Sequence, residues 1–546
     1  RDWFQLCLKE GLTVYRDQMF SGDMRSHAVK RIEEVLLLRA RQFREDNGPL
    51  AHNVRPESFV EINNFYTATV YTKGAEVIGM LRRLIGDEAY YKGCDLYFER
   101  HDGQAVTIED WIKAFEDTTG RDLSHFQQWY SQAGTPRLSV EETWDNGTLT
   151  LSFTQSTPAT PGQDVKKPQV LPIVVGLIAP DGTEVVPNTI LEMTESSQSF
   201  SFEGLSERPI ASILRDFSAP VILQREMDAK TRAFLLAHDT DPFNTWEMGR
   251  MLAKDTLVAM IVDGTEPDPE YLDALKTMLS DTSKDPAFRA LCLALPSQDD
   301  LAQTLTDAGV TPDPMAIYEQ LEELRHILAS AFKDILPALY ADNDAGAFKP
   351  DANGSGKRAL RMAVLSLLTL NDGGAAARKL FETADNMTEQ AGALTALLSA
   401  GTGQEELASF YAQWFHDRLV MDKWFMMQVA VAAPLEAAHI ADKLTQHADF
   451  EMKNPNRFRA VFGALQANHG GFHAPDGAAY KLLADWLIKL DPLNPQTTAR
   501  MCGAFETWKR YDADRQAMIR TQLERILATP NLSGDTTEMV SRILAA

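Results

Sequence analysis

Residues 134–153 read Gly134-Thr-Pro-Arg-Leu-Ser-Val-Glu-Glu-Thr-Trp-Asp-Asn-Gly-Thr-Leu-Thr-Leu-Ser-Phe153, and the pattern of hydrophobic residues changes within them. Apolar side chains alternate with polar ones on both sides of the turn signal Asn146-Gly147, at Leu138, Val140, Leu149, Leu151 and Phe153. A period of two around an Asn-Gly pair is typical of a β-hairpin. This stretch therefore predicts that a β-domain begins near residue 135.

The chain before this hairpin carries helical signals. Its apolar residues between positions 75 and 84 recur at helix-compatible spacing. Thr107-Ile-Glu-Asp110 resembles a capping box that opens a helix, and Gly120 is placed to end it. Residues 1–134 are therefore expected to form one mainly helical domain.

Strand signals continue after the hairpin, over residues 171–178, 199–202 and 210–217, with an Asp181-Gly182 turn between the first two. Several short strands in under 100 residues suggest a small Ig-like β-sandwich at residues 135–224. The segment Thr157-Pro-Ala-Thr-Pro-Gly162 is too rich in proline for a central strand and should be an exposed loop.

The rest of the chain, residues 225–546, has helical patterns almost throughout. One apolar stripe at spacings of three or four runs through Ile317, Leu321, Leu324, Leu328, Phe332 and Ile335. Successive amphipathic helices over this length suggest a superhelical solenoid of stacked pairs, and an irregular helical bundle is the alternative. The fold class predicted is a mainly α, multidomain protein with a small β-sandwich between two helical parts.

Composition narrows the possible functions. The formal net charge of −24 argues against nucleic-acid binding, which depends on clustered Lys and Arg, and no apolar stretch is long enough to span a membrane. Cys7, Cys94, Cys292 and Cys502 show no C-x-x-C pairing, which is typical of reduced thiols in a cytoplasmic protein. A monomer is the favoured oligomeric state.

The start of the chain reads as the middle of a helix. Arg1-Asp2-Trp3-Phe4-Gln5-Leu6 has neither an initiator Met nor the pattern of a signal peptide, so we expect further residues upstream. Without those upstream residues to pack against them, the apolar side chains of Trp3, Phe4 and Leu6 are expected to be exposed.

Two short blocks could carry chemistry. Glu10 lies between aromatic and aliphatic residues in Trp3-Phe-Gln-Leu-Cys-Leu-Lys-Glu-Gly-Leu-Thr13, where a buried carboxylate should be paired or bound to a metal. Tyr71 precedes Gly74 in Val70-Tyr-Thr-Lys-Gly-Ala-Glu-Val77. Taken alone, Glu10 also reads as a surface residue, and Tyr71 as a core tyrosine.

Together with Asn63-Asn-Phe-Tyr-Thr67, these blocks resemble the bacterial aminopeptidase N family of gluzincin metallopeptidases. The resemblance covers the whole chain, through Leu96-Tyr-Phe-Glu-Arg-His-Asp-Gly103, Trp129-Tyr-Ser-Gln-Ala-Gly-Thr-Pro136, Phe217-Ser-Ala-Pro-Val221, Val420-Met-Asp-Lys-Trp424, Asn454-Pro-Asn-Arg457 and Asn531-Leu-Ser-Gly-Asp535. It implies a truncated thermolysin-like catalytic domain at residues 1–134 and zinc-dependent release of amino-terminal residues from peptides.

The resemblance also implies roles for single residues. Glu10 would be the third zinc ligand, and Tyr71 would donate a hydrogen bond to the oxyanion of the tetrahedral intermediate. The family's H-E-x-x-H helix, with two ligand histidines and the general base, is absent from this sequence, as is its Gly-x-Met-Glu-Asn substrate loop. The chain alone is therefore expected to be inactive, since one carboxylate cannot make a three-ligand zinc site.

Four further residues receive weaker assignments. Asp17 could support a zinc-ligating histidine or form a surface ion pair, and Lys9 could influence the specificity pocket. Arg459 and Arg500 match positions that line the family's internal cavity, and a solvated helix face is the alternative. The spacing His469-Gly-Gly-Phe-His473 is not taken as a metal site, because paired glycines should break the helix that would aim both rings.

A second hypothesis comes from another class of protein: a non-catalytic solenoid scaffold that binds peptides or partners. An in-frame H-E-x-x-H upstream of Arg1 would favour the peptidase, and a start codon near Arg1 would favour the scaffold.

Overall fold

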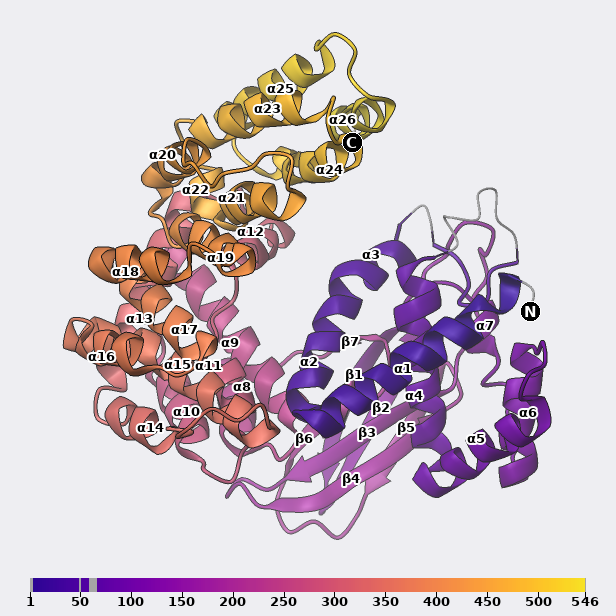
Figure 1. The fold of residues 1–546 in the computed structure, drawn as a ribbon. Coiled ribbons are helices and arrows are strands. Elements are labelled where there is room, and N and C mark those ends of the chain that lie inside the picture. Colours follow the sequence, from indigo (N-terminus) through magenta and orange to yellow (C-terminus); the bar gives the residue numbers. More distant parts are fainter. Residues whose placement is uncertain (1–2, 49–50, 58–65, 546) are drawn as a thin grey trace. The chain divides into compact units, whose positions relative to one another are not determined.

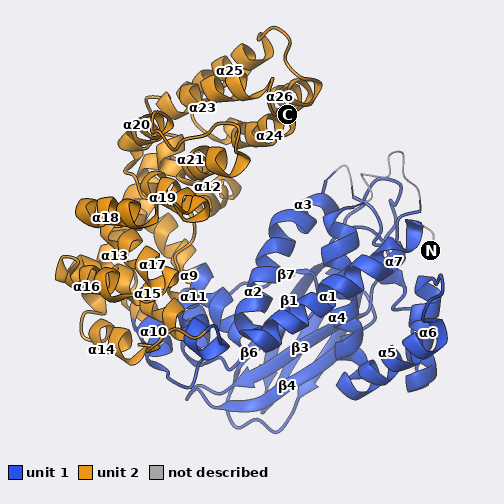
Figure 2. Ribbon diagram, in the orientation of Figure 1, with its two compact units in different colours: residues 1–251, 273–292, 350–356 blue, residues 252–272, 293–349, 357–546 orange. Residues whose placement is uncertain are grey.

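The computed structural model describes residues 3–48, 51–57 and 66–545 of the chain. Residues 63–65, which carry part of one family motif, lie outside the described residues. The backbone divides into two compact units, shown in Figure 2. The first unit contains residues 1–251, 273–292 and 350–356, and the second contains residues 252–272, 293–349 and 357–546.

The first unit begins with helices (Figure 1). Two of them are π-helical turns, η2 and η4, each followed by an α-helix. The bounds are η1 Trp3–Gln5, α1 Leu6–Met24, α2 His27–Leu37, η2 Leu38–Gln42, α3 Phe43–Asp46, η4 Thr69–Lys73, α4 Gly74–Ile85, α5 Asp87–His101, α6 Ile108–Thr119 and α7 Gln128–Ser131.

Local signals in this part behave as expected. Thr107 caps α6 with a complete capping box, in which its side chain accepts from the amide of Asp110 and the Asp110 side chain accepts from the amide of Thr107. Gly120 ends the helix in the left-handed region, at φ 69°. Each of these two features depends only on residues within one helical turn of it, which explains why the sequence alone predicts it.

The expected exposure at the start of the chain is correct for one residue and wrong for another. Trp3 is 50% exposed, whereas Leu6 is only 6% exposed. Helix α1 packs lengthwise on α4, so Leu6 and its neighbours Cys7 and Leu8 are buried within the described part of the chain itself.

The β-part of the first unit is the predicted sandwich. One sheet has strand order β5-β2-β1-β7 and the other β4-β3-β6. The hairpin β1–β2 pairs antiparallel from Arg137 opposite Ser156 to Asp145 opposite Thr148, and Asn146 and Gly147 take positive φ at its turn. The strands are β1 Arg137–Asp145, β2 Thr148–Ser156, β3 Leu171–Ile178, β4 Glu184–Met193, β5 Ser197–Phe202, β6 Ile210–Ile213 and β7 Ile222–Gln224.

One predicted strand ends early. Strand β6 stops at Ile213 rather than at Phe217, because the next residues form a 3-10 turn, η5 (Arg215–Phe217). Leu214, Asp216 and Phe217 all have φ between 45° and 61°, a region that non-glycine residues adopt only when their surroundings enforce it. This corner of the sandwich is therefore strained.

Helices α8 (Ala229–His238) and α9 (Pro242–Asp263) follow the sandwich, and the second unit is helical. Neighbouring helices contact one another along the chain, for example α19 with α21 and α23 with α25. The remaining bounds are α10 Pro269–Ser280, α11 Pro286–Leu293, α12 Gln298–Asp307, α13 Pro314–Ala331, α14 Leu336–Asp342, α15 Ala352–Asp372, α16 Ala375–Thr383, α17 Met387–Ser399, α18 Gln404–Trp414, α19 Arg418–Ala430, α20 Pro434–Thr445, α21 Pro455–Ala467, α22 His469–Phe472, α23 Ala478–Leu490, α24 Pro495–Cys502, η6 Gly503–Phe505, η7 Trp508–Arg510, α25 Ala513–Leu527 and α26 Gly534–Ala545.

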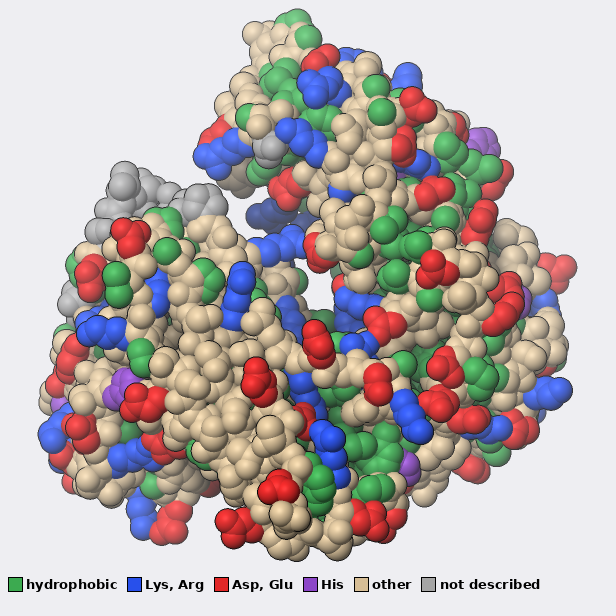
Figure 3. Space-filling view, turned by 180° about the vertical axis from the view of Figure 1, so that it is seen from behind, with side chains coloured by type: hydrophobic (Ala, Val, Ile, Leu, Met, Phe, Trp, Pro, Cys, Tyr) green, Lys and Arg blue, Asp and Glu red, His purple; other side chains and the backbone are tan. Residues whose placement is uncertain are grey.

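The surface mixes charges of both signs. On the face shown in Figure 3, acidic and basic side chains are interspersed over both units, without a broad basic patch. Among the described helices, none combines the length and apolar character that crossing a bilayer requires. All four cysteines are free thiols.

Candidate functional site

Glu10 and Tyr71 lie against each other. Glu10 is in the first turns of α1 and only 8% exposed, and Tyr71 is the central residue of the π-helical turn η4. Burial, the negative charge of Glu10 and a hydrogen bond to it raise the pKa of Tyr71 to about 12. The phenol therefore stays protonated near neutral pH and can act as a hydrogen-bond donor.

A close backbone contact brings these two side chains together. A Cβ on Gly11 would lie 2.9 Å from the carbonyl carbon of Gly74, and a Cβ on Gly74 would lie 3.4 Å from the Cα of Gly11. Only glycine permits such an approach on the α1 side without a shift of backbone. Because Gly11 follows Glu10 and Gly74 closely follows Tyr71, the contact sets the separation of the carboxylate and the phenol.

The π-helical form of η4 belongs to the site as well. π-helical turns are rare and occur frequently at functional sites. The turn is tied at its first residue, where the amide of Thr69 donates to Glu45 Oε1 at 2.8 Å and the hydroxyl of Thr69 accepts from Gln42 Nε2 at 3.2 Å. Thr69 is fully buried, and its bond to Gln42 lies inside the protein, whereas its bond to Glu45 is partly buried.

Two of the weaker candidates are on the same helix as Glu10. Lys9 is exposed, and its Nζ lies 2.7 Å from Glu10 Oε1, which places a cation at the carboxylate. Asp17 is also exposed, unlike Glu10, although both residues lie on α1. Burial lowers the pKa of Lys30 on α2, but the hydrogen bond and charge of Glu34 raise it, and the charge of Asp17 adds to that rise.

Arg459 and Arg500 lie in the second unit, on α21 and α24, and both are exposed. The guanidinium of Arg459 donates to Pro455 O at 3.1 Å and to Asn456 Oδ1 at 2.8 Å, within its own helix. Their role in lining a cavity stays a prediction.

His469 and His473 form a buried aromatic cluster. Gly470 and Gly471 lie in the four-residue helix α22, which ends at Phe472 before His473, so no longer helix carries both rings. The two imidazole centroids are 4.8 Å apart. His469 Nε2 lies 2.8 Å from the hydroxyl of Tyr511, and His473 Nδ1 lies 2.8 Å from that of Tyr480. Burial lowers the pKa of His469 to about 4, so the ring is neutral at pH 7.

The donor set for a metal is incomplete in the described part of the chain. Within it, no group of three or more His, Cys, Asp or Glu side chains is gathered closely enough to hold a metal ion. The buried carboxylate of Glu10 suits one coordination position of zinc, for which three protein ligands are usual in a catalytic site. Glu10 therefore fits as a single ligand whose partners are not among these residues.

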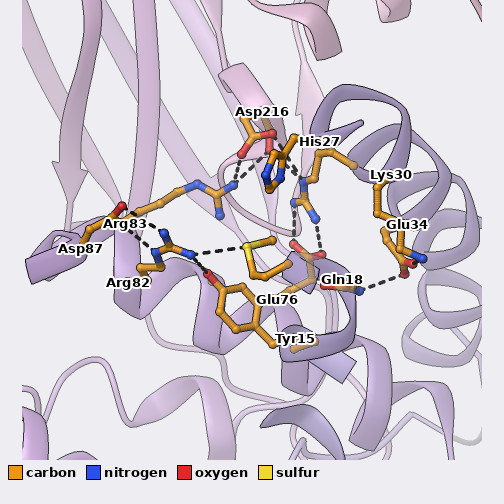
Figure 4. Close-up of a pocket in the computed structure, with 14 residues that line it drawn as sticks. Tyr15, Gln18, His27, Lys30, Glu34, Glu76, Arg82, Arg83, Asp87 and Asp216 are labelled. Carbon is orange, nitrogen blue, oxygen red and sulfur yellow. Dashed lines mark hydrogen bonds and ion pairs between the residues drawn. The ribbon is translucent and has the colours of Figure 1, made fainter. Parts of the chain in front are cut away.

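A cavity of about 380 Å³ lies further along α1 and α4 (Figure 4). Three arginines face it, and each is paired. Arg31 donates to both oxygens of Glu76 at 2.6 and 2.7 Å, Arg82 donates to both oxygens of Asp87, and Arg83 pairs with Asp216.

In these pairs, each guanidinium group is bonded to a carboxylate of the protein itself. Arg31 also donates to the carbonyl of Phe217 at 2.8 Å, so it joins α2, α4 and the strained corner of the sandwich. The cavity is therefore lined by a structural network, and neither Glu10 nor Tyr71 contributes to its wall.

Lys73 and Asp46 received no assignment from the sequence, although Lys73 lies two residues after Tyr71. Their side chains form an ion pair of 2.6 Å and are 1% and 0% exposed. The two partners are 27 residues apart in the sequence, and no local pattern predicts such a pair.

Three family models match consecutive parts of the chain. Residues 1–130 match the peptidase family M1 domain, residues 134–226 match a domain of unknown function, DUF3458, with an Ig-like fold, and residues 229–545 match DUF3458_C, described as ARM repeats. The last description agrees with the solenoid rather than the irregular bundle.

Curated relatives match along the full length of the chain. It is 44% identical to the aminopeptidase N of Caulobacter vibrioides and 39% identical to that of Escherichia coli, and it spans 64% of the length of each. Among solved structures, Legionella pneumophila aminopeptidase A in complex with aspartic acid matches with a TM-score of 0.79 and 28% identity, over 100% of this chain and 63% of that one.

Proposed function

The chain belongs to the bacterial aminopeptidase N family of M1 peptidases, and from this we propose that it supplies two groups of the active site of a zinc-dependent aminopeptidase acting on peptides. The observation that carries the proposal is the buried carboxylate of Glu10 against the phenol of Tyr71, whose pKa is raised. These are the two positions to which the family resemblance assigns a metal ligand and an oxyanion donor.

Each group has a defined task in this proposal. Glu10 holds one coordination position of the zinc, which when bound polarises the scissile carbonyl and activates water. Tyr71 donates its phenolic hydrogen to the oxygen of that carbonyl as it gains negative charge. Donation requires the protonated phenol, and the raised pKa of Tyr71 is consistent with this state.

The remaining ligands and the general base must come from elsewhere than these 546 residues, which contain no H-E-x-x-H. We expect the chain alone to hydrolyse no aminoacyl anilide and to retain no stoichiometric zinc. A cytoplasmic location is part of the proposal and rests on the four free thiols.

The coding sequence upstream of Arg1 tests this proposal. An in-frame H-E-x-x-H about eighteen residues before Glu10 is expected, by the family motif. The longer product should then hydrolyse aminoacyl anilides, and a chelator should abolish this. Chelator-sensitive hydrolysis by the 546-residue chain itself, free of host peptidases, would contradict the assignment of the ligands. A longer product without either the motif or activity would favour a scaffold.

A further inference from the structure

The buried ion pair of Lys73 and Asp46 calls for an explanation beyond stability. Taking two charges out of water carries a large desolvation penalty, and well-packed apolar residues of similar volume are often at least as stabilising. Here the pair lies wholly inside the first unit, with Lys73 Nζ 2.6 Å from Asp46 Oδ2. A charged pair fixes direction and distance, which apolar side chains do not.

Further bonds fix both members of the pair. Lys73 Nζ also donates to the carbonyl of Gly134 at 2.9 Å, and the hydroxyl of Thr135 donates to Asp46 Oδ2 at 3.0 Å. Gly134 and Thr135 lie just before β1, the first strand of the sandwich, which begins at Arg137. The pair thus joins the helical part of the unit to the start of the sandwich.

The position of Lys73 in the chain connects the ion pair to Tyr71. Lys73 is the last residue of η4, and Tyr71 is the central one. The first residue, Thr69, is bonded to Gln42 and Glu45. Both ends of this turn are therefore tied to the single short segment at residues 42–46, and Tyr71 lies between the two attachments.

We propose that Lys73 and Asp46 are positioning residues, which hold the π-helical turn so that the phenol of Tyr71 faces Glu10. The inference rests on the proposed function, because it explains how the oxyanion donor is oriented. Neither residue needs to touch a substrate, since both act through the backbone of η4. Thr135 supports the same orientation through its bond to Asp46.

The test uses the 546-residue chain and the NMR signal of Tyr71. With ¹³C-labelled tyrosine, Tyr71→Phe identifies the resonance, and Glu10→Gln shows where it moves when the carboxylate is lost. The double variant Lys73→Met/Asp46→Leu removes both charges without changing the net charge. At neutral pH, its Tyr71 resonance should move more than half of the way to the Glu10→Gln position.

A second buried pair provides the matched control. Arg215 and Asp239 lie 3.0 Å apart in the same unit, with side chains 1% and 0% exposed. The variant Arg215→Met/Asp239→Leu should leave the Tyr71 resonance in place. An unmoved resonance in the folded Lys73/Asp46 variant would overturn the proposal, and so would an equal shift in both variants.

Two less disruptive variants, both at Thr135, test the positioning proposal if the double variant does not fold. Thr135→Val removes one bond to Asp46, and it should shift the Tyr71 resonance in the same direction by a smaller amount. Thr135→Ser keeps the hydroxyl and should restore the original position. No shift with Thr135→Val, or no restoration with Thr135→Ser, counts against the proposal. These signals do not depend on hydrolysis, so an inactive longer product would contradict the proposed function and leave this result standing.

Discussion

Gly11 and Gly74 bring the backbones of α1 and α4 into direct contact, since a Cβ on Gly11 would lie 2.9 Å from the carbonyl carbon of Gly74. This contact is the geometric reason that a carboxylate on α1 meets a phenol in the turn that leads into α4.

Replacing Gly11 with alanine should therefore push the two helices apart. Overpacking of this kind typically destabilises a protein by about 1–3 kcal/mol, and urea unfolding would measure it. Gly463→Ala is the matched control, because Gly463 lies inside α21 and its Cβ would meet only the Cβ of Arg459, at 3.7 Å. That variant should gain up to about 1 kcal/mol from helix propensity. Equal effects of the two changes would show that the contact is not tight.

Substitutions of Glu10 and Tyr71 should affect kcat and zinc content differently in a longer product that carries the upstream ligands. Tyr71→Phe should lower kcat by about 10² to 10³, the range for loss of one oxyanion donor, with KM and zinc content nearly unchanged. Glu10→Gln should lower zinc content as well as activity, because it removes a ligand. Metal analysis alongside steady-state kinetics separates the two outcomes. Near-normal kcat in Tyr71→Phe would make Tyr71 a core tyrosine only.

Asp241 should make stability depend on pH near neutrality. Burial, then the charges of Asp239 and Asp216, raise its pKa from 3.8 to about 7. Because the folded state holds this proton more tightly, the stabilisation is complete below about pH 4 and is lost as pH rises through 7. Asp241→Asn should therefore be the more stable protein at pH 8, by more than about 1 kcal/mol, since one pKa unit corresponds to about 1.4 kcal/mol.

The same variant should retain the local bonds. Asp241 accepts from the amides of Asn244 and Asp216, and the amide oxygen of asparagine can accept both. Asp228→Asn is the control, at an exposed helix cap whose pKa is lowered by its bonds to Thr231. It should leave the slope between pH 4 and 8 as in the original protein. A similar slope in Asp241→Asn would mean that another group titrates.

The ion pair Arg31–Glu76 should contribute far more to the free energy of unfolding than a surface ion pair does. Arg31→Met leaves the carboxylate of Glu76, which is 3% exposed, without its bidentate partner. Breaking a buried pair in this way typically destabilises by about 3–5 kcal/mol. The double variant Arg31→Met/Glu76→Gln should recover part of that loss in a double-mutant cycle.

Lys92–Glu88 is the matched comparison for that cycle. It is an exposed i,i+4 pair on α5, and its coupling should be much smaller, because solvent screens the two charges. Couplings of the same size at both places would show that the network around the cavity adds nothing to the fold.

Sequence reasoning succeeded where partners are close along the chain. The capping box of α6 spans Thr107 to Asp110, and the β1–β2 hairpin turns at Asn146-Gly147, so a few residues suffice to identify each. The early end of β6 was missed, because the strain in η5 is maintained by Arg31 and Arg83 from far upstream. Strands β4 and β7 were not identified, since their apolar alternation is short or irregular.

The candidate site shows the same division. Glu10 and Tyr71 were identified from motifs, and the structure places their side chains in contact. Their chemical roles stay predictions. The buried pair Lys73–Asp46 and the π-helical turn could not be predicted, because both depend on tertiary contacts rather than on residue order.

The π-helical turn also limits which changes of length this part of the chain can accept. A π-turn contains one residue more than the α-helical turn that could replace it. Deleting a single residue within Thr69–Lys73 would let the segment relax into an α-helical turn, and its two flanks would keep nearly the same orientation, because one full turn replaces another. The backbone that carries Tyr71 would change, however, so the phenol would leave the position that the wider turn gives it. Substitutions can be absorbed one side chain at a time, but this deletion would remove the wide turn that holds the phenol of Tyr71, so η4 should vary in residue identity long before it varies in length.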